Sequence, residues 1–115
     1  RGRRIMEIDP NKCIDFIFEK APEYAKAKAV LSDLENAKSS IKADLMKASN
    51  ETTIAGQERE AYASPQYKQH CKAIGIATHE VEMLKLHIKC AELRWETWRT
   101  QQANERQFDK MIRNN

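Results

Sequence analysis

The second half of the chain carries an apolar pattern that repeats every seven residues for more than four repeats. Ser64-Pro65 precedes it, and serine is a good N-cap while proline suits the first position of a helix. No further proline follows, so we predict one helix from Pro65 to about Arg113, about 72 Å long at ~1.5 Å per residue. With Tyr67 at heptad position a, the pattern predicts coiled-coil-like packing that fades after Trp98. Positions a and d are Tyr67, His70, Ile74, Ala77, Val81, Leu84, Ile88, Ala91, Trp95, Trp98, Gln102 and Glu105.

A second apolar stripe lies on another face of the same predicted helix. Its members are spaced by seven, three, four and three residues: Ile76, Met83, Leu86, Cys90 and Leu93. A helix with two apolar stripes needs two partners, and the first half of the chain supplies only one. We expect the other to be a second copy of the chain related by two-fold symmetry. The sequence therefore predicts a homodimer, and both parallel and antiparallel arrangements remain open.

The first half of the chain predicts two further helices. Asp9-Pro10 is a second start signal, followed by a short helix over residues 10–20 that Pro22 is expected to end. A longer helix is predicted over residues 23–49, and a short connector helix over 57–63. One apolar stripe marks the longer helix: Ala27, Leu31, Leu34, Ala37, Ile41, Leu45 and Ala48. The predicted fold is all-α: a long antiparallel helical hairpin with a short N-terminal helix, in one domain over residues 6–115.

The expected hairpin leaves part of the last helix uncovered. If the hairpin is aligned from its connector, the start of the 23–49 helix falls near Glu92. The short N-terminal helix would then cover what remains, and its phenylalanines would lie near Trp95 and Trp98.

Composition agrees with long helices and limits the classes of function. Charged residues make up 32% of the 115 residues and aromatic residues 7%. Residues 1–5, "RGRRI", resemble an expression-tag remnant before Met6. Without their three arginines, 17 basic residues balance 17 acidic ones, so net charge gives little support for a nucleic-acid partner. The second half alone is basic, with nine Lys and Arg against six Asp and Glu from Pro65 to Asn115.

Localisation is inferred from what the sequence contains. No apolar run approaches the ~18–20 residues that span a bilayer, and no signal peptide follows Met6. Cys13, Cys71 and Cys90 are an odd number without a disulfide-type spacing, and they suit a reducing compartment. We therefore expect the chain in the cytoplasm, without contact to a membrane.

Trp95 and Trp98 admit two interpretations. Together with nearby arginines they could form a platform on which bases stack. Both rings, however, fall on the a/d stripe, which favours packing in the core or at a dimer interface. If packing is right, Trp95→Ala is expected to cost about 3–5 kcal/mol of stability. The candidate contacts for a nucleic acid or a protein partner are then the basic residues Arg59, Arg94, Arg99, Arg106, Lys110 and Arg113.

The sequence offers little for metal binding or catalysis. His87 and Cys90 could both reach one metal ion, but His70, Cys71 and His79 lie two or more helical turns away. The chain has no Gly-rich phosphate loop, no HExxH motif and no nucleophile elbow. We therefore expect no cofactor, no metal, no small-molecule substrate and no enzymatic activity.

The stretch "QEREAYASPQY" is the candidate hinge of the hairpin. Tyr62 and Tyr67 flank the helix break at Pro65 and could close the end of the hairpin, with buried rings and hydroxyls in water. The alternative is an exposed tip that docks a partner, since loops often carry function.

These residues also carry a resemblance to a known group of proteins. The chain resembles small uncharacterised phage and prophage proteins over residues 57–107. The matching residues are Arg59, Glu60, Ala61, Tyr62, Ala63, Pro65, Tyr67, Trp98, Arg99, Asn104 and Arg106. The resemblance implies a phage accessory protein near DNA recombination or replication, and it brings no catalytic residues. We therefore expect a protein that binds DNA or a DNA-processing protein, or alternatively an interaction module that inhibits a host defence enzyme without touching nucleic acid.

Overall fold

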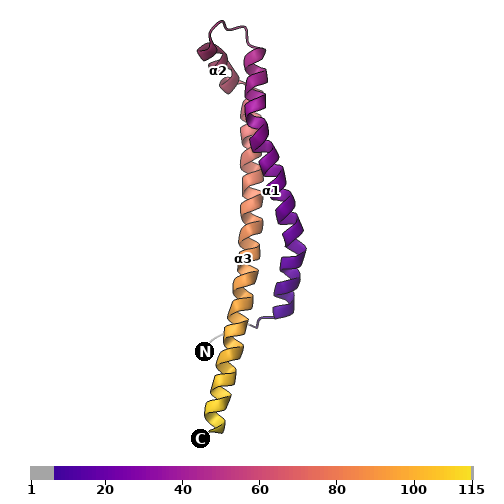
Figure 1. Ribbon diagram of the computed structural model, residues 1–115, viewed down its shortest axis with the longest axis vertical. Coiled ribbons are helices and arrows are strands. Elements are labelled where there is room, and N and C mark those ends of the chain that lie inside the picture. Colours follow the sequence, from indigo (N-terminus) through magenta and orange to yellow (C-terminus); the bar gives the residue numbers. More distant parts are fainter. Residues whose placement is uncertain (1–6, 115) are drawn as a thin grey trace, which may run out of the picture. The chain divides into compact units, whose positions relative to one another are not determined.

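A computed structural model describes residues 7–114, and its regular structure is helical throughout (Figure 1). Helix α1 spans Pro10–Lys47, α2 spans Ile54–Ala63 and α3 spans Pro65–Arg113. Residues 7–114 contain no strand, so the predicted all-α class is confirmed. The expected tag remnant, residues 1–5, lies outside the described residues.

The helices pack as two compact units. The central unit is Tyr24–Met83, and the terminal unit holds the described residues up to Glu23 together with those from Leu84 onward. Within each unit a part of α1 lies alongside a part of α3 (Figure 1). Helix α2 belongs to the central unit.

Side-chain caps determine where the helices begin. Asp9 Oδ1 accepts a hydrogen bond from the backbone N–H of Asn11 at 2.9 Å, and α1 begins at Pro10 as predicted. Thr53 caps α2 by accepting from the Gly56 N–H at 3.0 Å, so α2 begins three residues before the predicted position. Ser64 Oγ accepts from the Gln66 N–H at 3.2 Å, and α3 matches its predicted range.

The predicted break at Pro22 is wrong, because α1 continues through this residue. Proline removes one hydrogen bond, to the carbonyl of Phe18, but Phe18 is 77% exposed and water can take the place of that donor. Lys20 Nζ also pairs with Glu23 Oε2 at 3.3 Å across the proline. The residues turned away from solvent keep their seven-residue spacing on both sides, as in Cys13, Lys20, Ala27 and Leu34. The packing of this stripe therefore outweighs the tendency of proline to end a helix.

The a/d stripe of α3 is the face that the rest of the chain covers. Val81 in the central unit and Leu84 and Ala91 in the terminal unit are between 6% and 8% exposed. The other a and d positions from Tyr67 to Gln102 are half-buried, and Glu105 is exposed where the pattern fades. The second stripe remains open to solvent: Ile76 is 65%, Met83 39%, Leu86 56% and Leu93 53% exposed, and Cys90 is also exposed.

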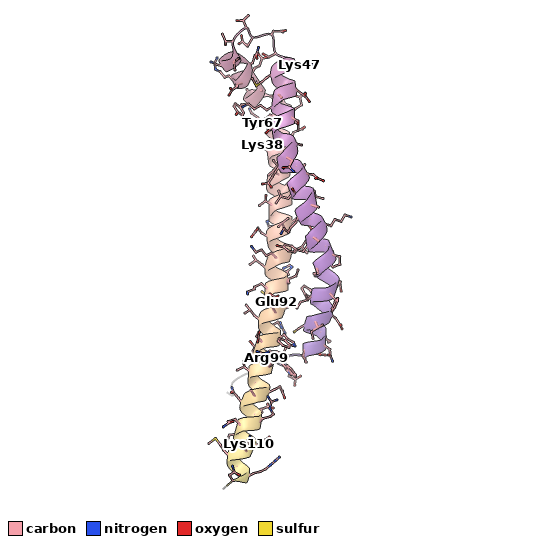
Figure 2. The ribbon with its side chains drawn as sticks, in the orientation of Figure 1. Lys38, Lys47, Tyr67, Glu92, Arg99 and Lys110 are labelled. Carbon is pink, nitrogen blue, oxygen red and sulfur yellow. The ribbon has the colours of Figure 1, made fainter. Side chains whose placement is uncertain are left out.

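Helix α2 changes the register of the hairpin within the central unit. The predicted alignment pairs the end of α1 with the start of α3. Instead, Lys42 of α1 pairs with Glu58 of α2 at 3.5 Å, and Lys38 lies over the ring of Tyr67 at 6.0 Å (Figure 2). Near its C-terminal end, α1 therefore contacts α2. The predicted stripe of α1 is half-buried from Ala27 to Leu45, whereas Ala48, beyond the helix, is exposed.

Two glycines in helices should respond in opposite ways to alanine. A Cβ at Gly75 would meet nothing within 4 Å, so Gly75→Ala is expected to raise the free energy of unfolding by about 0.5–1 kcal/mol through helix propensity. A Cβ at Gly56 would lie 2.9 Å from Thr53 Oγ1 and 3.2 Å from Glu51 Cβ. Gly56→Ala should therefore disturb the cap of α2 and lower stability by about 1 kcal/mol. Urea unfolding measures the free energy of unfolding of both variants. Changes of the same sign and size in the two variants would contradict the tight packing at Gly56.

Candidate functional site

The C-terminal end of α3, within the described residues 103–114, is exposed to solvent. Every residue from 103 to 114 is exposed, in contrast to the partly buried residues between Leu84 and Gln102. Three large apolar side chains lie in this end: Phe108 is 62%, Met111 59% and Ile112 57% exposed. Lys110 marks its position near the end of the helix (Figure 2). An amphipathic helix end with exposed apolar residues is a candidate surface for a partner.

The basic residues of this end form a row. Arg99, Arg106 and Arg113 are spaced by seven residues, so they share one side of α3, and Lys110 lies one turn from Arg106 on the adjacent position. Phe108 and Met111 lie on the opposite side of the helix. Asp109 borders the row and offsets part of its charge. From Arg94 to Arg113 there are five basic and three acidic residues. We call Arg99, Arg106, Lys110 and Arg113 the basic row.

Trp95 is a packed residue of the terminal unit. It is half-buried, and it lines a pocket of about 410 Å³ together with Ile14 and Ile17 of α1. The Arg99 guanidinium lies 5.1 Å from the centre of the Trp95 ring and 3.2 Å from Glu96 Oε1. Part of the ring is therefore already covered by an arginine of the same helix, which leaves less of it for a stacked base.

The sequence predicts phenylalanines near Trp95 and Trp98, and the pocket beside Trp95 is lined by isoleucines of α1. Phe16 lies instead in a separate pocket with Arg94, and Phe18 faces solvent. Ile14 and Ile17 line one pocket with Trp95, and Ile17 is half-buried whereas Ile14 is 41% exposed. Trp98, also half-buried, lies one turn further along α3.

A pocket of about 470 Å³ in the terminal unit is lined by two cysteines. Buried Cys13 and exposed Cys90 both line it, as does His87, and both cysteines are free thiols. The charged side chains around it have both signs, with Asp9 beside Lys12 and Arg94. Among residues 7–114, no three His, Cys, Asp or Glu side chains are arranged to hold a metal ion.

The two tyrosines of the candidate hinge contact each other in the central unit. Their ring centres are 5.2 Å apart with an interplanar angle of 76°, an edge-to-face arrangement. The ammonium of Lys42 lies 4.7 Å from the centre of the Tyr62 ring. The side chain of Tyr62, and to a smaller extent the carboxylate of Glu58, raise the pKa of Lys42 against an opposing effect of desolvation. Tyr67 is half-buried, whereas Tyr62 is 45% exposed, so only one ring fits the predicted plug.

His70 makes a contact that the sequence pattern does not predict. Its Nε2 atom lies 2.6 Å from the backbone carbonyl oxygen of Leu34, and the side chain is partly buried. The a/d pattern indicates that His70 faces α1, but the pattern cannot indicate a hydrogen bond to the main chain. Arg59, the remaining predicted contact residue, is exposed on α2 in the central unit and is therefore not part of the basic row.

No helix within residues 7–114 is long and apolar enough to cross a membrane. The chain was also compared with protein-family models, curated proteins and solved structures, and none of the three comparisons finds a match.

Proposed function

We propose that the chain is a non-enzymatic phage accessory protein of DNA metabolism, which binds DNA through the basic row at the end of α3. The observation that carries this proposal is the lack of cover over residues 103–114, which leaves the cationic side chains of Arg106, Lys110 and Arg113 in solvent. Cationic side chains in one line along a helix can follow a phosphate backbone.

The test is a titration of labelled single- and double-stranded DNA, followed by fluorescence anisotropy at several salt concentrations. The triple variant R106Q/K110Q/R113Q is expected to lose at least tenfold in affinity, and its salt dependence should fall by up to about three phosphate contacts. The matched control K68Q/K72Q/K85Q removes the same charge from other exposed sites of α3. No binding by the unchanged protein at low salt contradicts the proposal, and equal losses in both variants contradict the assignment to the basic row.

The second candidate function is binding to a protein partner without nucleic-acid contact, for example as an inhibitor of a host defence enzyme. The exposed apolar side chains of Phe108, Met111 and Ile112 favour it, because they lie away from the basic row. A variant with serine at all three positions separates the two functions. It should keep DNA affinity if the basic row binds DNA, and it should lose the protein partner if the apolar side binds one.

We also propose that the chain is a homodimer through α3. The support is the second stripe, whose five apolar or thiol side chains stay exposed while the a/d stripe is covered. Light scattering at micromolar concentration should return twice the chain mass of 13.3 kDa, and a monomer would contradict the dimer.

A further inference from the structure

The exposed stripe of α3 is a second heptad stripe, on the side of the helix away from the covered one. In the frame that places Tyr67 at position a, its members fall at positions c and f, which alternate at spacings of three and four. His79 also belongs to it, between Ile76 and Met83. Thr97 extends it, because its hydroxyl donates to the Leu93 carbonyl at 2.9 Å and leaves the methyl group for contact. The stripe thus has the spacing of a helix–helix interface.

Resting on the proposed homodimer, we propose that a second copy packs on this stripe in antiparallel orientation, with the two-fold axis beside Leu84 and Lys85 of α3. In this register, the numbers of two facing stripe residues sum to 169. Ile76 then faces the partner's Leu93, and Met83 faces the partner's Leu86. By symmetry each contact occurs twice, so all four large apolar side chains of the stripe find an apolar partner. A further layer joins His79 and the partner's Cys90, and at the end of the stripe Thr97 faces the partner's Lys72.

The charges beside the stripe support the same register. Positions b and g flank it, and in an antiparallel pair each flank faces its own counterpart. Glu82 then lies opposite the partner's Lys89, and Glu80 lies opposite the partner's His87. All four side chains are exposed in the chain, so they are accessible to a second copy. Between residues 73 and 96 this register places no two like charges opposite each other.

A parallel pair in register would be less complementary. Flank b of one helix would then face flank g of the other, five residues further along. Lys89 would lie beside the partner's Arg94, and these like charges repel. The antiparallel register thus satisfies both the apolar and the charged positions, and the parallel one does not.

Charge reversal distinguishes the two orientations. In the antiparallel dimer, Glu82→Lys and Lys89→Glu each turn two attractive pairs into two repulsive ones, and each should raise the dimer dissociation constant about tenfold. The double variant E82K/K89E restores opposite charges and should recover the original dissociation constant. In the parallel dimer, Lys89→Glu would instead tighten the dimer by relieving the repulsion from Arg94. Analytical ultracentrifugation measures the dimer dissociation constants of the three variants. A lower dissociation constant for K89E than for the unchanged protein overturns the antiparallel register.

Disulfide cross-linking tests the register directly. In a background with alanine at Cys13, Cys71 and Cys90, the single variants I76C and L93C are oxidised separately and as a mixture. The antiparallel register predicts a cross-linked dimer only in the mixture. Cross-linking within either single variant, or none in any sample, overturns the register. Light scattering of the same reduced samples keeps the outcomes distinct, because a monomer there contradicts the proposed dimer itself, whereas a dimer with the wrong cross-links contradicts only its orientation.

Discussion

Leu84→Ala is expected to lower the free energy of unfolding by about 2–4 kcal/mol. The side chain is only 8% exposed, and its removal leaves a cavity in the covered stripe of α3 as well as losing apolar burial. The matched control is Leu86→Ala, two residues further along the same helix, where the side chain is 56% exposed. Within one chain, that change should cost less than about 1 kcal/mol.

Protein concentration separates the two leucines. Urea unfolding at several concentrations should show a loss for Leu84→Ala that does not depend on concentration, since that side chain is buried within one chain. The effect of Leu86→Ala should appear only where the dimer forms, because its proposed partner is a second copy. Equal losses for both variants at every concentration would contradict the assignment of the two faces of α3.

Trp95→Ala is expected to destabilise the protein by about 2–3 kcal/mol, below the range for a fully buried tryptophan because the ring is half-buried. The loss comes from the half of the ring that is turned away from solvent, beside the pocket that it lines with Ile14 and Ile17 of α1. The control Arg99→Gln removes the cation over the ring and its pairing with Glu96, and should cost less than about 1 kcal/mol. Thermal unfolding measures both. A Trp95→Ala protein that is fully stable but no longer binds DNA would show that the ring is a binding platform instead.

The elements that the sequence predicts well are those determined by local chemistry. Asp9-Pro10 and Ser64-Pro65 mark the starts of α1 and α3, because capping depends only on neighbouring residues. The apolar residues at heptad positions a and d identify the covered face of α3, and those at positions c and f identify the exposed stripe. Both assignments follow from helix geometry alone.

The elements that the sequence predicts poorly depend on packing between helices. Pro22 breaks an isolated helix, but in α1 the stripe on both sides of it is held by contacts that the local rule ignores. The register of the hairpin is also ambiguous, because a heptad pattern looks the same after a shift of seven residues. Contacts such as Lys42 with Glu58 and His70 with the Leu34 carbonyl select one register, and neither follows from periodicity.

In the candidate site too, the sequence predicts the local pattern but not the packing between helices. The arginines at positions 99, 106 and 113 are visible in the sequence as a seven-residue row, but their exposure depends on where α1 begins relative to α3. The sequence pattern predicts cover for residues 93–113, whereas every residue from 103 to 114 is exposed to solvent. Charge alone places Arg59 among the candidate contacts, and in the structure this residue lies on α2 in the central unit.

The uncovered end of α3 has a thermodynamic consequence for any partner. Helical segments of this length are only marginally stable in water without tertiary contacts, so most of the order in residues 103–113 must come from the rest of α3 and from intrinsic propensity. A partner that requires this segment to be helical therefore pays its ordering entropy on binding. Substitution of Asn104, which lies seven residues before Met111 on the side of α3 opposite the basic row, would then change DNA affinity through helix propensity alone. Recognition strength could thus evolve at positions outside the contact surface.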